Sequence, residues 1–176
     1  MMHPALPDEL QKLTAALEDV GFPAAYLAPS ADNPFHLVRA MLDGDRASPE
    51  LMLEITPVPG LDDMSILQFI VGLPVALVPE HLDTLGRYLL DLNTECLLSG
   101  FGMRADAQLL YYRTMVPGRP HVLDIEVLVE VVWTVAYLID RYLPLIRPVA
   151  AGEQDLATAV QALVVHLQTP YTPPGP

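Results

Sequence analysis

Apolar residues near the start of the chain recur every three or four positions, at Leu6, Leu10, Leu13, Leu17 and Val20. This spacing places them on one face of a helix, so it predicts an amphipathic helix that ends at Gly21. A second such helix is predicted to begin at Pro79 and to end near residues 93–95, because four leucines and Cys96 repeat the spacing. We expect each helix to bury one stripe and to leave its opposite face in water.

Strand signals fill the region between these two helices. Three segments, 35–42, 50–58 and 64–72, are rich in apolar residues and are separated by short stretches typical of turns. Alternation in 50–58 predicts one buried and one exposed face, whereas 64–72 is apolar on both faces and is expected to be covered on both. Because the connections are short, we expect an antiparallel meander, preceded by a short extended piece within 22–27.

Two interpretations are open for the stretch Gly100-Phe101-Gly102: a phosphate-binding loop or one arm of a β-hairpin. A phosphate loop follows a strand, precedes a helix and carries a third glycine or a lysine. Here the stretch follows a helix, lacks those residues and leads into the β-branched and aromatic run 109–116. The sequence therefore favours a hairpin with its turn at 104–107, in which the glycines leave room on the face opposite Phe101.

The last third of the chain is predicted to be helical. Asp124 suits the cap of a long apolar helix that reaches about Ile146 and is bent or ended by Pro144. Another helix is expected from Asp155 to Gln168, followed by a disordered tail at 169–176. The whole order predicts an α+β fold with an antiparallel sheet of about five strands, in a single domain over 1–168. Residues 6–146 form its expected core, and 147–168 an appended helix.

The charge of the chain limits the classes of partner that it can bind. It carries 22 acidic and 9 basic residues, a formal net charge of −13. Nucleic acids and anionic membranes are therefore unfavourable partners, since both are bound through lysine and arginine. No apolar run reaches the ~20 residues of a membrane span, and the first residues do not match a secretory signal, so we expect a cytoplasmic protein. Because 52% of residues are apolar and only 18% charged, some apolar surface is expected to face a partner.

No set of residues suggests catalysis, a metal or a cofactor. The five histidines lack the close spacing of metal ligands, and no acid, base and nucleophile can be named together. Cys96 lies in an apolar helix stripe, which is typical of a packed thiol. Glu130 is surrounded by valines in the long helix, so it either pairs with Arg104 or Arg113 or faces solvent. We therefore expect a protein without enzymatic activity.

Several positions along this order resemble a known family. They are Asn93 near the end of the second helix, Phe101, Leu110, Tyr112 and Arg113 of the hairpin, its turn residue Asp106, and the long helix from Asp124. Over residues 6–146 the chain resembles the YbjN-type and type III secretion chaperone-like superfamily. The resemblance implies a small, acidic, commonly dimeric bacterial protein that binds partner polypeptides without catalysis. The predicted C-terminal helix departs from the minimal chaperone pattern.

Two functions follow as hypotheses. The first is a homodimeric protein-binding module that receives a partner polypeptide on its apolar sheet and helix surface. The residues expected to contact the partner are Phe101, Met103, Tyr111, Tyr112, Arg113 and Trp133. The alternative is a small-molecule-sensing regulatory domain, with a pocket between the sheet and the long helix near Phe101, Tyr112 and Trp133.

Overall fold

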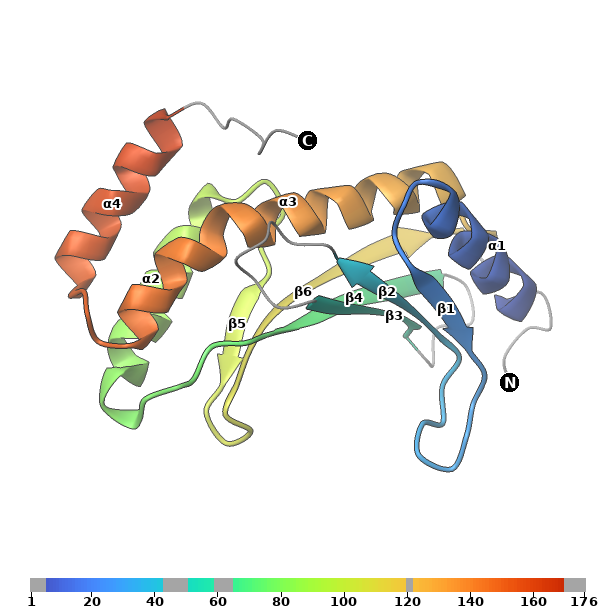
Figure 1. Cartoon of the computed structure of the whole chain (residues 1–176), viewed down its shortest axis with the longest axis horizontal. Helices are drawn as coiled ribbons and strands as arrows, with labels where there is room; N and C mark the ends of the chain where they lie inside the picture. Colours follow the sequence, from blue (N-terminus) through green and yellow to red (C-terminus); the bar gives the residue numbers. More distant parts are fainter. Residues whose placement is uncertain (1–5, 43–50, 59–64, 120–121, 170–176) are drawn as a thin grey trace. The chain divides into compact units, whose positions relative to one another are not determined.

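The computed structural model describes residues 6–42, 51–58, 65–119 and 122–169 (Figure 1). This part of the chain forms four α-helices and one six-stranded antiparallel sheet, in the order β1-β2-β3-β4-β6-β5. The helices are α1 (Leu6–Asp19), α2 (Leu82–Glu95), α3 (Ile125–Ala150) and α4 (Leu156–Gln168). The strands are β1 (Ala24–Leu27), β2 (Leu37–Leu42), β3 (Leu51–Pro57), β4 (Ser65–Leu73), β5 (Phe101–Arg104) and β6 (Leu109–Gly118). The expected α+β class is confirmed; residues 170–176 of the predicted tail lie outside the described ranges.

The sheet has one strand more than the sequence predicted. The additional strand, β1, falls within 22–27, where only a short extended piece was expected, and it pairs with β2 along its whole length. The three predicted strands correspond to β2, β3 and β4, and consecutive strands pair antiparallel as expected. Two four-residue strands, β1 and β5, therefore form the edges of the sheet, and short edges limit pairing with other chains.

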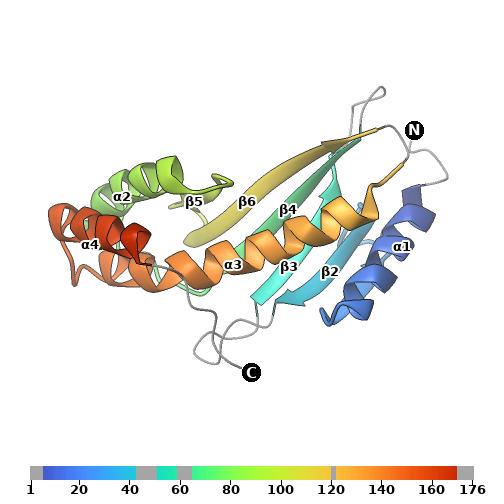
Figure 2. The ribbon, with the colours of Figure 1, turned by 90° about the horizontal axis from the view of Figure 1, so that it is seen from above.

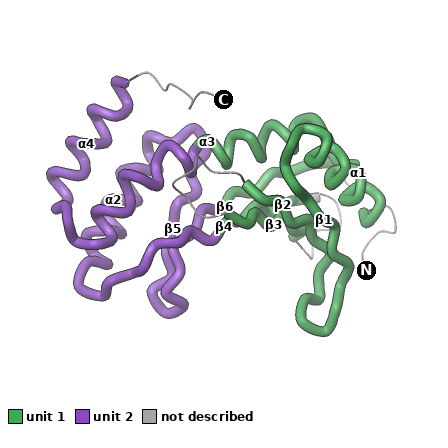
Figure 3. The backbone as a smooth tube through the Cα atoms, viewed as in Figure 1, with its two compact units in different colours: residues 1–71, 113–137 green, residues 72–112, 138–176 purple. Residues whose placement is uncertain are grey.

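The chain divides into two compact units (Figure 3). Unit 1 comprises residues 1–71 and 113–137, and unit 2 comprises 72–112 and 138–176. Three elements, β4, β6 and α3, contribute residues to both units. Each unit has buried apolar residues of its own.

The core of unit 1 lies between one face of its strands and two helices, α1 and the first half of α3 (Figures 1 and 2). The four leucines predicted to face inward from α1 are all buried: Leu6, Leu10, Leu13 and Leu17. Paired residues of neighbouring strands, such as Ala40 with Leu53 and Leu53 with Val71, are buried below the helices. Helix α1 ends as predicted at Gly21, whose φ of 96° lets the Phe22 N–H reach the Leu17 carbonyl at 2.9 Å.

Strand β4 is fully buried on one face only, whereas its apolar sequence predicted cover on both. Leu67 and Phe69 are buried, whereas Ile66 and Ile70 on the other face are only half-buried. Ile70 lies opposite Glu54, a carboxylate that is itself half-exposed. Among the described residues of unit 1, this face of the sheet meets solvent, so an apolar run in a strand did not require a second covering layer.

Unit 2 combines α2, the second half of α3, α4 and the β5–β6 hairpin. Helix α2 packs against α4 and β5, and Ala159 and Leu163 of α4 are buried (Figure 2). The predicted C-terminal helix is present, and Asp155 caps it, because its Oδ1 accepts the Thr158 N–H at 2.8 Å. The predicted C-terminal helix is therefore an integral layer of this unit.

Helix α3 continues through two prolines, so Pro144 does not end it, and the alternative of a bend at Pro144 stays a prediction. The helix runs to Ala150 and contains both Pro144 and Pro148. Each proline removes one N–H donor, yet Leu143 and Ile146 beside them are at most 1% exposed. Tertiary burial thus outweighs the local helix penalty in this stretch.

The hairpin interpretation of Gly100-Phe101-Gly102 is confirmed. Strands β5 and β6 pair with Phe101 opposite Tyr112, and the turn occupies 105–108. The space beside Gly102 is not vacant, however, because the hydroxyl oxygen of Tyr111 on the opposite strand lies only 2.7 Å from where a Cβ of residue 102 would stand. A cross-strand tyrosine thus covers the glycine.

Candidate functional site

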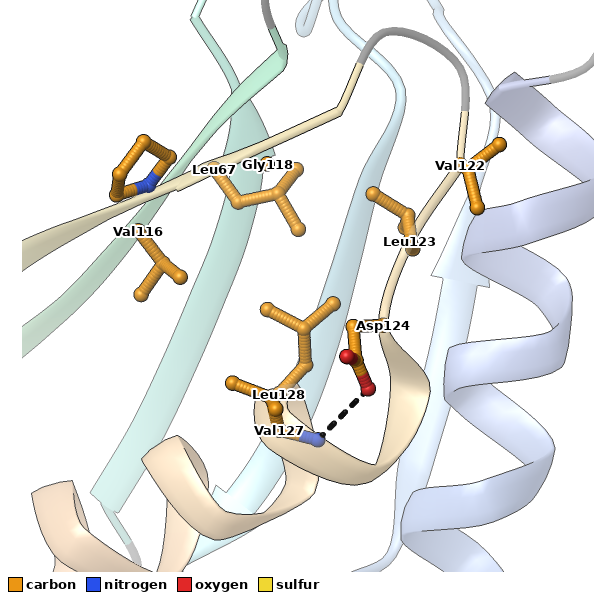
Figure 4. A pocket seen from close by; sticks show the side chains of 9 residues that line it. Leu67, Val116, Gly118, Val122, Leu123, Asp124, Val127 and Leu128 are labelled. Atoms are coloured by element: carbon orange, nitrogen blue, oxygen red, sulfur yellow. Dashed lines mark hydrogen bonds between the residues drawn. The ribbon is translucent and has the colours of Figure 1, made fainter.

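A small apolar pocket lies within unit 1, between the sheet and the start of α3 (Figure 4). Its volume is about 40 Å³. Leu67 of β4, Val116 of β6 and Leu128 of α3 contribute to its walls. Val122 and Val127, which are 58% and 48% exposed, also line it and carry apolar surface out to solvent. The pocket therefore opens beside aliphatic surface that is already accessible.

The start of α3 is fixed by two carboxylates. Asp124 caps the helix as predicted, and its Oδ1 accepts the Val127 N–H at 3.3 Å, the dashed line in Figure 4. Glu9 of α1 accepts the Leu123 N–H at 3.2 Å and also pairs with Lys12 at 2.5 Å. These contacts lower the pKa of Glu9, with the hydrogen bond from Lys12 as the main cause. The rim of the pocket is thus held in place from both helices.

The solvent side of α3 continues from the pocket as an acidic and aromatic face. Glu126, Glu130 and Trp133 are all exposed and follow one another at spacings of four and three residues, which places them side by side. Neither glutamate has an ion-pair partner among the described residues, and the sequence contains no lysine, arginine or histidine from 122 to 137. Two like charges at this spacing oppose the helix by about 0.2–0.5 kcal/mol. We call this face, together with Val122, Val127 and the pocket, the α3 surface.

The Trp133 ring is held on this face by its contact with the Phe22 ring. The centroid of its ring lies 4.4 Å from that of Phe22, which is 5% exposed, at an interplanar angle of 58°. Trp133 itself remains 49% exposed. A half-exposed indole with a fixed orientation suits contact with a cation or with another apolar side chain.

Two of the six predicted contact residues belong to the core of unit 2. Phe101 and Tyr112 are 4% and 0% exposed, and their rings meet edge to face at 4.9 Å. The Tyr112 hydroxyl donates to the Leu98 carbonyl at 2.9 Å, and burial raises the pKa of this tyrosine far above its usual value. Asn93 fixes the Phe101 backbone from both sides, accepting its N–H and donating to its carbonyl. Neither ring is placed to meet a partner.

The other four predicted residues lie in different surroundings. Met103 is half-buried and faces Gly86 of α2, 3.1 Å from where a Cβ of residue 86 would lie. Tyr111 is also half-buried, above Gly102. Arg113 and Trp133 are exposed and both belong to unit 1, but only Trp133 lies on the α3 surface. The sequence reasoning thus found one residue of this surface and missed Val122, Val127 and Glu126. The absence of basic residues over 122–137 is a sequence signal that could have indicated this surface.

The groups considered for catalysis occupy ordinary positions. Cys96 is half-buried after α2, and burial, followed by the nearby Glu95 charge, raises the pKa of its thiol to about 11, so it is a poor nucleophile. Glu130 faces solvent, which resolves the two predicted alternatives for this residue, while Arg104 pairs with Asp106 at 2.6 Å. Within the described residues, no three histidine, cysteine, aspartate or glutamate side chains gather as metal ligands do.

Comparisons with known proteins give no further identification, because no family model, no curated protein and no solved structure matches the chain. In the described ranges, no helix combines the length and the apolar character needed to cross a membrane.

Proposed function

We propose that this chain is a non-catalytic, cytoplasmic module that binds a partner polypeptide through the α3 surface. The observation that carries the proposal is the apolar pocket at the start of α3, with half-exposed Val122 and Val127 at its edge. Anchor sites of protein interfaces have this form, in which a preformed pocket accepts one side chain and nearby apolar surface excludes water. Burying the exposed valines against a partner would add to the hydrophobic free energy of binding.

The size of the pocket supports a polypeptide over a metabolite. Sites for drug-sized ligands usually measure about 300–1,000 Å³, whereas this pocket measures about 40 Å³. A few methyl groups of one peptide side chain would fill it. The alternative function, a small-molecule-sensing domain, needs a larger cavity than this one.

The resemblance to the YbjN-type and type III secretion chaperone-like superfamily is part of the same proposal. Asn93, Phe101 and Tyr112, on which the resemblance rests, hold the β5–β6 hairpin in place through hydrogen bonds and ring packing. They therefore argue for a related scaffold, and the α3 surface supplies a place where such a scaffold would bind. Dimerisation of the chain, which the resemblance implies, is part of the proposal as well.

A peptide display selection tests this function. The immobilised full chain is exposed to a library of random peptides, in parallel with Val127→Gln, which places an amide at the edge of the pocket. We expect the natural chain to enrich peptides that share an aliphatic residue, and Val127→Gln to retain roughly a tenth of that binding, the equivalent of about 1.4 kcal/mol.

Val165→Gln is the matched control. Val165 lies on α4 in unit 2 and is 55% exposed, close to the 48% of Val127, so the same substitution changes the same kind of surface elsewhere. Its selected peptides should bind as they do to the natural chain. If the natural chain enriches no peptides, or if both variants lose binding equally, the proposed function is wrong.

A further inference from the structure

The acidic and aromatic part of the α3 surface indicates which kind of side chain a bound partner would present there. Glu126, Glu130 and Trp133 lie together on the solvent side of one helix. The two carboxylates have no ion-pair partner in the described part of the chain, and the indole is 49% exposed. We propose that this face recognises an arginine side chain of the bound polypeptide, an inference that rests on the proposed function.

Arginine satisfies both parts of this face at once. Its planar guanidinium stacks on aromatic rings and at the same time donates hydrogen bonds to carboxylates from its edges. Lysine offers a point charge without the flat surface, so it matches the carboxylates but covers the indole less well. The bound guanidinium would also relieve the repulsion between Glu126 and Glu130. An acidic peptide would increase that repulsion.

The pocket and the arginine site would be occupied by one segment. Val127, at the edge of the pocket, and Trp133 are six residues apart on α3, which corresponds to about 9 Å along the helix axis and about 120° around it. An extended peptide covers the axial part alone with roughly three residues. The partner segment therefore carries an aliphatic side chain for the pocket and an arginine at least about three positions away.

The local charge favours such a segment over a second copy of this chain. Each copy carries a formal net charge of −13, so two copies repel each other at low salt. The α3 surface adds Glu126 and Glu130 to that field, and the sequence from 122 to 137 contains no basic residue to offset them. A basic peptide is attracted by the same field, which also raises its association rate.

The closing experiment repeats the peptide selection with the double variant Glu126→Gln/Glu130→Gln. The natural chain should enrich peptides with an arginine near an aliphatic residue, and the double variant should keep the aliphatic preference but lose the arginine. The most enriched peptide is then titrated into both proteins, followed by the fluorescence of Trp133, the only tryptophan of the chain. We expect its affinity to fall roughly fivefold to tenfold with the double variant, because each exposed charge pair contributes modestly. Replacing the peptide arginine by glutamine should cost a similar factor, and combining both changes should cost little more.

Asp91→Asn/Glu95→Gln is the matched control, since these two exposed carboxylates of α2 have the same four-residue spacing and lie in unit 2. This control should leave the affinity unchanged. Peptides that depend on Val127 but show no arginine preference, and bind the glutamate variant equally well, would overturn this inference and leave the proposed function intact. If the natural chain enriches no peptides, both this inference and the proposed function are wrong. A full-length dimer that Trp133→Ala converts to a monomer would place a second copy on this face and would also overturn the inference.

Discussion

The Trp133 ring of unit 1 and the aromatic cluster of unit 2 lie in opposite surroundings. In unit 2 the rings of Tyr88, Phe101, Tyr112 and Tyr142 are at most 4% exposed, and edge-to-face contacts join Phe101 to Tyr112 and Tyr142. In unit 1 Phe22 and Phe69 are buried, but Trp133 is 49% exposed and lies beside two glutamates that have no ion-pair partner among the described residues. Unit 1 therefore leaves at its surface a ring of the kind that forms the core of unit 2.

The comparison is tested most strongly by truncating one ring in each unit. Tyr112→Ala removes a fully buried ring and its hydrogen bond to Leu98, so it should lower the free energy of unfolding by about 3–5 kcal/mol. Trp133→Ala removes a half-exposed ring whose main described contact is Phe22, and it should cost about 1 kcal/mol of stability while weakening peptide binding. Urea unfolding followed by far-ultraviolet circular dichroism measures both changes.

Tyr112→Phe is the control for the larger effect. It keeps the ring and loses only the hydroxyl, so it should cost about 1 kcal/mol, the usual net value of one hydrogen bond. Equal losses of stability for Tyr112→Ala and Trp133→Ala would show that the two rings do not differ as described.

The sequence predicted the elements of both units better than it predicted their surfaces. The spacing of leucines in α1 and the cap residue Asp124 predicted helices that the structure confirms, because these signals are local. Burial of Phe101 and Tyr112 depends on which helices cover the hairpin, and no local pattern contains that information. Tertiary packing likewise extended α3 past Pro144.

The α3 surface could not be predicted from the sequence for a related reason. Trp133 was proposed as a contact residue together with five residues of the hairpin region, because all are large, aromatic or charged. The six residues differ in exposure. Trp133 is exposed because it lies on the side of α3 that faces away from the strands. Glu130 illustrates the point, since its valine neighbours left an ion pair and a solvent-facing position both open, and the structure shows that it faces solvent. Helical periodicity places residues on one face but does not say which face a distant strand will cover.

A second comparison concerns the glycines that end one helix in each unit. Gly21 follows α1 with a φ of 96° and has open space beside it, whereas Gly152 follows α3 with a φ of 74° and has the His81 ring where a Cβ would lie. Gly21→Ala should therefore cost about 1–2 kcal/mol from backbone strain alone. Gly152→Ala should cost about 1 kcal/mol more, because the imidazole must move.

The double variant His81→Ala/Gly152→Ala isolates the second contribution. With the imidazole removed, the cost of adding a methyl group at position 152 should fall to that found at Gly21, as measured by urea unfolding in the His81→Ala background. An undiminished cost would mean that His81 does not restrict position 152.

The smallest expected effect is a pH dependence confined to unit 2. Burial, followed by the positive charge of Arg141, lowers the pKa of His166, whose Nε2 is buried without a hydrogen-bond partner in the described residues. The unfolded chain therefore binds a proton on this residue at a higher pH than the folded chain, near 6.5. Stability from neutral His166 is fully present above that pH and is lost as the pH falls toward the lower folded value.

His166→Gln removes the titrating group but keeps a polar side chain, so the stability of the variant should fall less between neutral pH and pH ~5 than that of the natural chain. Urea midpoints measured across this range provide the test, and the difference between the two proteins cancels the contributions of the other histidines. Fluorescence of Trp133 in the folded proteins should stay the same over this range, because Trp133 belongs to unit 1. Parallel pH profiles for the two proteins would show that the surroundings of His166 do not hold it neutral. The interior of unit 2 would then differ less from the exposed surface of unit 1 than the burial of Tyr112 and the exposure of Trp133 suggest.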